Sequence, residues 1–174
     1  MPISEVYNID CLEYMRGLPD KYFDLCIADP PYGIDFSNAN NTKSARNRLH
    51  RGAGKLKNRI LQTDKKDWDA NPPSDEVFEE MVRVSKNQII WGGNYFKLPP
   101  TRGIICWDKK QPWVNFSQIE MAWTSFDSPA RLFSFDNRTN DKIHPTQKPV
   151  ALYAWLLDNY GIGGQDFRPI PREW

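Results

Sequence analysis

The apolar positions of the chain form short runs separated by polar segments or by segments that contain glycine and proline. Continuous or alternating runs predict strands, and apolar positions three and four residues apart predict helices. The predicted strands are 22–29, 87–93, 102–109, 116–126 and 130–136. The predicted helices are 74–86 and 148–160, and a short strand enters a third helix within 7–19. Because strands and helices alternate, the pattern predicts an α/β protein with a largely parallel sheet and helices on both faces.

Capping residues and apolar stripes define the three helices. In 7–19, Asp10 is the predicted N-cap residue, and Leu12 and Met15 share the apolar face. In 74–86, Ser74 is the predicted N-cap residue, and the apolar stripe comprises Val77, Phe78, Met81 and Val82. In 148–160, Pro149 suits the first turn, and the stripe comprises Leu152, Tyr153, Leu156 and Leu157.

The strand predicted over 116–126 is expected to be half-buried, because its side chains alternate between two sets. One set is Phe116, Gln118 and Glu120, and the other is Ile119, Met121 and Trp123.

The strand predicted over 22–29 ends abruptly in Asp29, followed by Pro30, Pro31 and Tyr32. Its continuous apolar centre predicts burial on both faces of the sheet. In open α/β sheets, ligands bind beyond the carboxyl ends of the strands. The sequence therefore predicts a functional site at Asp29–Tyr32.

These four residues suit an attack by the exocyclic amine of a nucleobase. The Asp29 carboxylate can accept one N–H, and the Pro30 carbonyl can accept the other. The fixed φ angles of Pro30 and Pro31 would hold that carbonyl rigid. The ring of Tyr32 offers a face on which an extruded base can stack, worth roughly 1–3 kcal/mol per base. The alternative interpretation is an ordinary turn in which Asp29 makes a local hydrogen bond.

A second polar segment, "HPTQKP" at 144–149, precedes the last predicted helix. Thr146 and Gln147 can donate hydrogen bonds, and Lys148 adds a positive charge beside a helix start, so together they could hold a carboxylate. The alternative is a polar helix cap with a surface lysine. His144 has no evident partner in the sequence and is interpreted as structural.

The segment 37–70 lacks apolar periodicity and is interpreted as a basic insertion that we expect to be mobile. Between residues 37 and 63 it carries seven basic residues and no acid, which favours a polyanionic partner. A solvated loop without a ligand is the alternative. The candidate DNA-binding residues are Lys43, Arg46, Arg48, Arg51, Lys55, Lys57 and Arg59. His50, in the same segment, is interpreted as a phosphate neighbour.

Composition changes this picture little. The 174 residues, of which 40% are hydrophobic, fit a single domain, and the net charge is +1. No apolar run approaches the ~18 residues of a membrane span, and we see no signal peptide. The three cysteines lack any metal-binding spacing, which favours free thiols in a cytoplasmic protein without a metal site.

The quoted motifs resemble, over residues 4–160, the DNA amino-methyltransferases that use S-adenosylmethionine, in the subgroup whose catalytic tetrapeptide precedes the cofactor loop. Residues 8–33, "NIDCLEYMRGLPDKYFDLCIADPPYG", are similar to the opening of that family. "NQIIWGGNYF" and "RGIICWDK" are similar to its next strands, and "HPTQKP" is similar to the segment before the helix that holds the methionine end of the cofactor.

The resemblance implies a Rossmann-like methyltransferase sheet and a site made of named residues. It implies catalytic roles for Asp29, Pro30, Pro31 and Tyr32. It also implies S-adenosylmethionine binding by Asp10, Cys11, Asp29, Thr146, Gln147 and Lys148. An Asp at the head of the tetrapeptide is more similar to members that methylate adenine N6 than to those that methylate cytosine N4. It also argues against protein-glutamine and RNA methyltransferases.

The resemblance fails after the last predicted helix, where the family continues with a strand and a glycine-rich cofactor turn. Here Gly161, Gly163 and Gly164 come too early, and the prolines of "FRPIPREW" do not suit a central strand. We therefore expect a truncated sheet, weakened or lost cofactor binding, and self-association through the exposed sheet. Adenine-N6 methylation of DNA is the leading hypothesis. A noncatalytic DNA-binding remnant, or a methyltransferase for cytosine N4, RNA or protein, are the alternatives.

Overall fold

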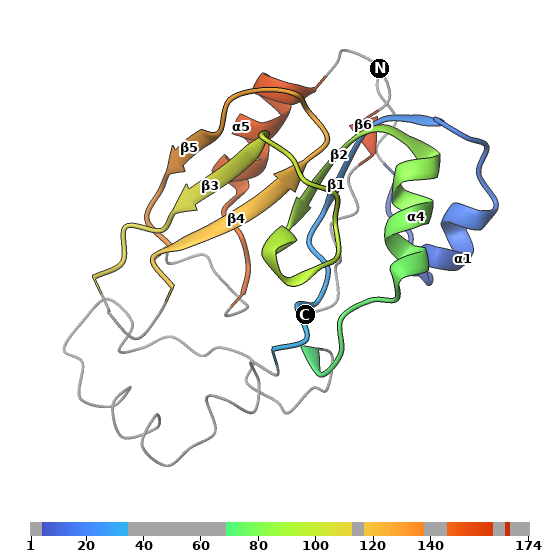
Figure 1. The fold of residues 1–174 in the computed structure, drawn as a ribbon, viewed down its shortest axis with the longest axis horizontal. Coiled ribbons are helices and arrows are strands. Elements are labelled where there is room, and N and C mark those ends of the chain that lie inside the picture. Colours follow the sequence, from blue (N-terminus) through green and yellow to red (C-terminus); the bar gives the residue numbers. More distant parts are fainter. Residues whose placement is uncertain (1–4, 35–68, 113–116, 138–145, 162–165, 168–174) are drawn as a thin grey trace.

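The computed structural model describes residues 5–34, 69–112, 117–137, 146–161 and 166–167. The described strands form one six-stranded sheet in the order β5-β3-β4-β2-β1-β6 (Figure 1). Their bounds are β1 Phe23–Ala28, β2 Ser85–Trp91, β3 Ile104–Asp108, β4 Ile119–Thr124, β5 Arg131–Ser134 and β6 Asp166–Phe167. The helices are α1 Cys11–Arg16, α4 Asp75–Val84 and α5 Val150–Tyr160, with a 3₁₀ turn, η2, over Gly93–Tyr95. The molecule therefore has a mixed α/β fold, as the pattern predicted.

One strand of the described sheet runs against the others. β1 is parallel to β2 and β6, and β3 is parallel to β5. β4 is antiparallel to both β2 and β3, so β2 and β3 point the same way (Figure 1). The expectation of a largely parallel sheet is confirmed. The reversal of β4 has a consequence for the site, because β4 begins at the edge where β1, β2 and β3 end.

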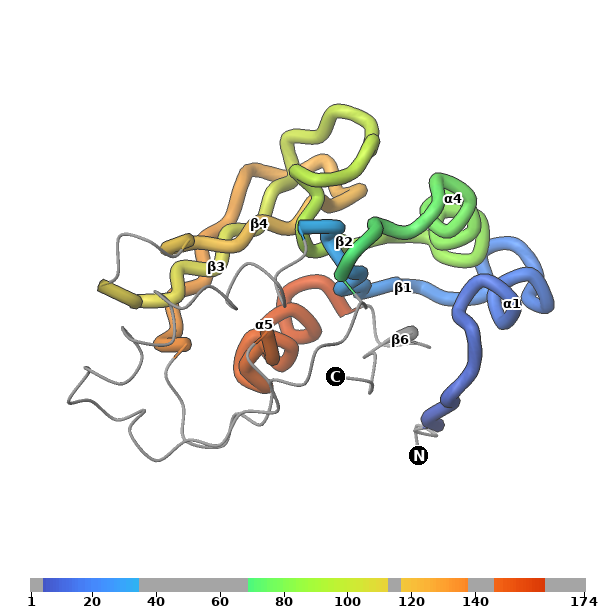
Figure 2. The backbone as a smooth tube through the Cα atoms, turned by 90° about the horizontal axis from the view of Figure 1, so that it is seen from below, coloured from blue at the N-terminus to red at the C-terminus, as the bar shows by residue number. Residues whose placement is uncertain are grey.

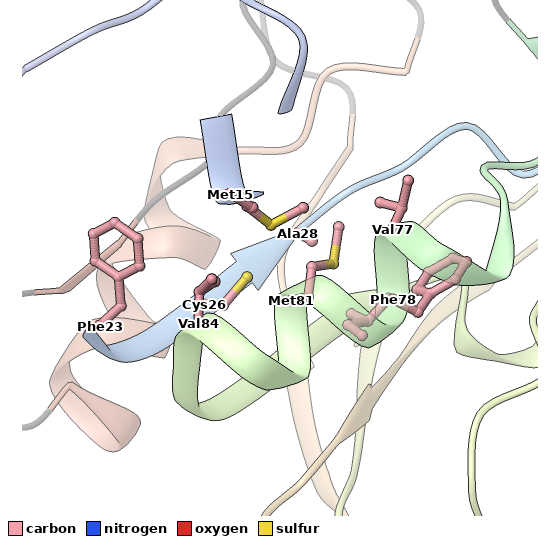
Figure 3. Close-up of a cluster of buried hydrophobic side chains, with 9 residues drawn as sticks. Met15, Phe23, Cys26, Ala28, Val77, Phe78, Met81 and Val84 are labelled. Atoms are coloured by element: carbon pink, nitrogen blue, oxygen red, sulfur yellow. The ribbon is translucent and has the colours of Figure 1, made fainter. Parts of the chain in front are cut away.

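Helices cover both faces of the sheet, as predicted (Figure 2). On one face, α1 and α4 pack against β1 through Met15, Cys26, Met81 and neighbouring side chains (Figure 3). On the other face, Leu152 and Leu156 of α5 pack under the central strands. β1 is buried from both sides, with Leu25–Ala28 between 0% and 3% exposed, and this explains its continuous apolar centre.

The predicted N-cap residues of α1 and α4 stand at the N-cap positions, but only Asp10 makes the cap hydrogen bond. The Asp10 carboxylate accepts the backbone N–H of Glu13 at 2.9 Å and so caps α1. Ser74 precedes α4 but makes no side-chain cap hydrogen bond. The strand predicted before α1 is wrong, because residues 5–10 have no regular structure.

One prediction about buried side chains is wrong. Val82 is 42% exposed, and the stripe of α4 continues through Val84, which lies seven residues after Val77 and returns to the same face. The strand β4 is half-buried, as its alternation predicted. Its more buried set contains Glu120, Ala122 and Thr124, while Ile119 is 42% exposed. The inner face of β4 thus carries a charged residue.

The predicted basic insertion 37–70 falls outside the described residues, except for positions 69 and 70. Among the described residues, no helix is both long enough and apolar enough to cross a lipid bilayer.

Candidate functional site

The candidate site is built around Asp29, directly after β1. Its carboxylate Oδ1 accepts a hydrogen bond from the Lys148 ammonium at 2.6 Å and one from the Tyr32 hydroxyl at 3.1 Å. Among the described residues, both hydrogen bonds to this carboxylate end on Oδ1. The Asp29 side chain is 19% exposed, so it is accessible from solvent. The site thus brings together two segments that are 119 residues apart.

Lys148 is buried, and its three N–H donors all have protein acceptors within reach. Besides Asp29, the ammonium donates to the Tyr32 hydroxyl at 3.2 Å and lies 3.2 Å from Oε2 of Glu120. It also lies 5.2 Å from the ring centre of Trp91, as a cation–π contact. A lysine with only 3% of its side chain exposed is not a surface cap residue, so that alternative is wrong.

Glu120 is held from both sides by lysines. Its Oε2 faces Lys148, and its Oε1 contacts the ammonium of Lys109, directly after β3. The strand register places Glu120 opposite Trp107, so Lys109 reaches it from the adjacent strand. The four charged side chains Lys109, Glu120, Lys148 and Asp29 form a neutral, alternating row, which we call the charge row.

Burial and pairing set the protonation of the charge row. Burial raises the pKa of the Asp29 carboxyl above its ordinary value and outweighs the opposing effect of Lys148, and the charge of Glu120 raises it further. For Glu120, the two lysines outweigh burial and lower its pKa to about 2. Burial alone would lower the pKa of Lys148, but Asp29 and Glu120 raise it well above its ordinary value. Lys148 and Glu120 therefore stay charged at neutral pH, and Asp29 is the more easily protonated carboxylate.

The backbone after Asp29 is fixed by a second buried carboxylate, that of Asp69. Its Oδ1 accepts the backbone N–H groups of Tyr32 at 2.8 Å and Gly33 at 3.0 Å. Asp69 is 2% exposed, so these are charge-assisted hydrogen bonds in a low dielectric. Gly33 has φ +71° and lies against Pro72, a combination that only glycine adopts without strain. The turn that carries Tyr32 is therefore held in place by hydrogen bonds to Asp69 and by the packing of Gly33 against Pro72.

Aromatic rings surround Tyr32. Its ring stacks on Tyr95 with the ring centres 5.0 Å apart and the planes 15° apart, and Phe96 contacts it edge-on. Tyr95 is 49% exposed and belongs to η2, which begins after Gly92 at the end of β2. One face of Tyr32 is thus covered by Tyr95.

A buried donor lies next to the charge row. The indole N–H of Trp91 has no hydrogen-bond partner in the described part of the chain, although Trp91 is 0% exposed. Orphaned buried donors are rare, because desolvation without a partner costs roughly 1–3 kcal/mol.

The other predicted site residues are distributed unevenly. Asp10 caps α1, and Cys11 is exposed on the first turn of that helix. Thr146 and Gln147 are half-buried just before Lys148. Direct contacts connect Asp29, Tyr32 and Lys148. The candidate DNA-binding residues Lys43, Arg46, Arg48, Arg51, Lys55, Lys57 and Arg59, together with His50 and His144, lie outside the described residues.

Four residues of the site were not predicted from the sequence: Lys109, Glu120, Asp69 and Tyr95. Lys109 follows a predicted strand and so lies at the sheet edge where sites are expected. Glu120 belongs to one of the two alternating sets of its strand, and the sequence did not show that this set faces inward. Asp69 and Tyr95 carry no local pattern that separates them from ordinary loop residues. The convergence of Asp29, Lys109 and Glu120 follows from the reversed direction of β4 (Figure 1).

Among the described residues, no group of three or more histidine, cysteine or acidic side chains could hold a metal ion. No family model matches the chain. No curated protein matches it either.

Proposed function

We propose that this chain is an S-adenosylmethionine-dependent DNA methyltransferase that acts on the exocyclic N6 amine of adenine. The observation that carries the proposal is the Asp29 carboxylate. It lies at the carboxyl end of a buried strand and beside the Tyr32 ring, and Lys148 and Tyr32 hold it by one oxygen only. The motif resemblance of Asp29–Tyr32 and of 144–149 supplies the reaction class, and the geometry is compatible with it.

In this proposal Oδ2 of Asp29 accepts an N–H of the amine, while the Pro30 carbonyl accepts the other. These two acceptors draw the nitrogen toward a tetrahedral geometry and make its lone pair available. S-adenosylmethionine, when bound, supplies the electrophilic methyl group and keeps the electron pair of the broken S–C bond on sulfur. Forming the N–C bond requires the amine to give up one proton. Asp29 is suited to accept it, because its pKa is raised.

The described residues fit the cofactor in part. A carboxylate beside aromatic rings suits the positive charge of a sulfonium. Thr146 and Gln147 stand at the start of α5, where a carboxylate would also benefit from the helix dipole. Lys148 does not fit its predicted cofactor role in this arrangement, because Asp29, Tyr32 and Glu120 occupy its donors. We therefore assign Lys148 to the support of Asp29.

Transfer of a labelled methyl group to unmethylated duplex DNA tests the proposal, with nucleoside analysis to identify the product. We expect N6-methyladenine from the wild-type chain and a loss of at least about 100-fold in Asp29→Ala. Asp158→Ala, which removes an exposed aspartate of α5, is the matched control and should retain activity.

Each other outcome of the same assay rejects adenine-N6 methylation of DNA. Label on cytosine N4, on RNA or on added protein would identify another substrate. DNA binding without transfer, unchanged by Asp29→Ala, would favour a noncatalytic DNA-binding protein.

Cofactor binding is tested separately by calorimetric titration of the isolated chain with S-adenosylmethionine. Gly163 and Gly164, which come too early in the sequence to match the family's cofactor turn, lie outside the described residues. Our proposal retains the sequence-based expectation of weak affinity. Tight binding by the isolated chain would contradict that expectation while leaving the assignment of Asp29 intact.

A further inference from the structure

The charge row contains two residues, Lys109 and Glu120, to which the proposed function gives no role. Both come from strands on the far side of β2 from Asp29, so neither is needed to shape the turn that carries it. Both side chains are largely buried, since the Lys109 side chain is 12% exposed and the Glu120 side chain is 23% exposed. Buried charges are costly unless they are paired, and these pair in a row that ends at Asp29.

We propose that Glu120 is a positioning residue, which holds the Lys148 ammonium in place so that it binds Oδ1 of Asp29 and leaves Oδ2 to an incoming amine. That Asp29 meets an amine rests on the proposed function. The positioning itself rests on the contacts of the charge row alone.

Lys148 is divided between two acids. Its ammonium lies 2.6 Å from Oδ1 of Asp29 and 3.2 Å from Oε2 of Glu120. A lysine shared in this way cannot turn fully toward Asp29 and engage both of its oxygens. Without the second acid, an ammonium with three donors and a flexible four-carbon stem would be free to do so.

Glu120 is itself anchored, by Lys109. Lys109 contacts Oε1, leaving Oε2 for Lys148, so the carboxylate cannot rotate away from the row without losing one partner. The backbone around Lys109 is fixed as well, because its N–H donates to the carbonyl of Gln118 at 3.0 Å. The anchor therefore consists of β3, β4 and the charges between them.

Glu120 and Lys109 shift the pKa of Asp29 in opposite directions. The negative charge of Glu120 raises the pKa of Asp29. Lys109 neutralises part of the charge of Glu120, so Glu120 attracts the Lys148 ammonium less strongly. Lys148 then interacts more strongly with Asp29. Within the described part of the chain, the other ionisable groups near Asp29 are Tyr32 and Tyr153, and burial raises the pKa of both hydroxyls, so neither is charged at neutral pH.

The test is a ¹³C NMR titration of the Asp29 side-chain carboxyl in the chain alone, assigned with Asp29→Asn. In Glu120→Gln we expect the midpoint to move to lower pH, because Lys148 then pairs with Asp29 alone. In Lys109→Met we expect it to move to higher pH, because Glu120 then draws Lys148 away. Lys109→Arg should return the midpoint toward that of the wild type.

Controls separate positioning from loss of structure. Lys86→Met removes a lysine from another ion pair, that with Asp24, and should leave the midpoint unchanged. General loosening of the fold would let water in and move the midpoint in the same direction in both variants. Midpoints that shift in the same direction, or that do not shift, would overturn the proposal. If Glu120→Gln fails to fold, the comparison of Lys109→Met with Lys109→Arg still shows in which direction loss of the Lys109 charge moves the midpoint.

The titration needs no ligand, so its result is independent of methyl transfer. Opposite shifts in a chain that transfers no methyl group would support the positioning role and reject the proposed function. Methyl transfer by a chain whose midpoints shift in the same direction would support the proposed function and reject the positioning role.

Discussion

Gly92 lies so close to Tyr32 that a Cβ atom at position 92 would be 2.3 Å from Cε1 of the Tyr32 ring. Gly92 also has φ +71°, in the left-handed region. We predict that Gly92→Ala lowers the free energy of unfolding by roughly 2–5 kcal/mol, from backbone strain and overpacking together. Urea denaturation measures this effect.

The matched control is Gly17→Ala. Gly17 has φ −78° and its nearest neighbour to a new Cβ is a backbone oxygen 3.5 Å away, so alanine fits. Its free energy of unfolding should change by less than about 1 kcal/mol. Equal losses in the two variants would contradict the close approach of Gly92 to Tyr32.

Asp69 is predicted to stabilise the turn that carries Tyr32. Asp69→Ala removes the acceptor of two backbone N–H groups and should lower the free energy of unfolding by roughly 2–4 kcal/mol. Asp69→Asn keeps one acceptor oxygen and should lower the free energy of unfolding by a smaller amount. Asp127→Ala, which breaks an exposed ion pair with Arg102, should change stability by no more than about 0.5 kcal/mol. If Asp69→Ala changed the free energy of unfolding as little as Asp127→Ala does, the turn would not depend on the Asp69 carboxylate.

Two substitutions separate the roles of the Tyr32 ring and hydroxyl. Tyr32→Ala removes the proposed stacking face, so kcat/KM for methyl transfer to duplex DNA should fall by about 10–100-fold. Tyr32→Phe keeps the ring but removes a hydrogen bond that lowers the pKa of Asp29, so the acidic limb of the rate profile should move to higher pH. Tyr22→Ala, at an exposed position before β1, is the control. Equal losses for Phe and Ala would argue against stacking.

Stability should depend on Glu120 in an acidic window. Its folded pKa of about 2 lies below the ordinary 4.5, so its contribution is present above pH 4.5 and lost as the pH falls toward 2. The pH-dependent part of the difference between wild type and Glu120→Gln should be roughly 3 kcal/mol. Denaturation at several pH values between 2 and 7 measures it, with the exposed Glu79→Gln as control. A difference that is constant with pH would contradict the pairing of Glu120 with its lysines.

The basic segment predicts that DNA affinity falls steeply with salt. Changing Arg46, Arg48 and Arg51 to glutamine should reduce the slope of log K against log salt by about 0.9 for each lost phosphate contact. Arg102→Gln, on the described surface, is the control. Affinity that does not respond to salt would reject DNA binding by this segment.

The sequence was sufficient to predict the elements that carry the site. An apolar run that stops at an acid identifies β1 and Asp29, because burial on both faces of a sheet excludes polar residues until the strand leaves it. The side-chain cap at Asp10 and the buried face of α5 were also predictable, since both depend on residues at most four positions apart.

The contacts between segments could not be predicted in the same way. Nothing near Lys148 in the sequence indicates that its ammonium meets Asp29, because that pairing depends on the order of strands in the sheet. The inner face of β4 could not be predicted for a related reason. A glutamate can point inward when two lysines from other segments neutralise it, and hydrophobicity contains no information about such partners.

The reversed strand places a constraint on how the chain can change over generations. A shift of β4 by one residue against β3 would exchange its two faces and present Ile119 or Met121 to the buried ammonium. The connection between β3 and β4 can therefore gain or lose residues only while Trp107 remains paired with Glu120. Whether an insertion between β3 and β4 is tolerated therefore depends more on the alignment of the two strands than on the composition of the segment that connects them.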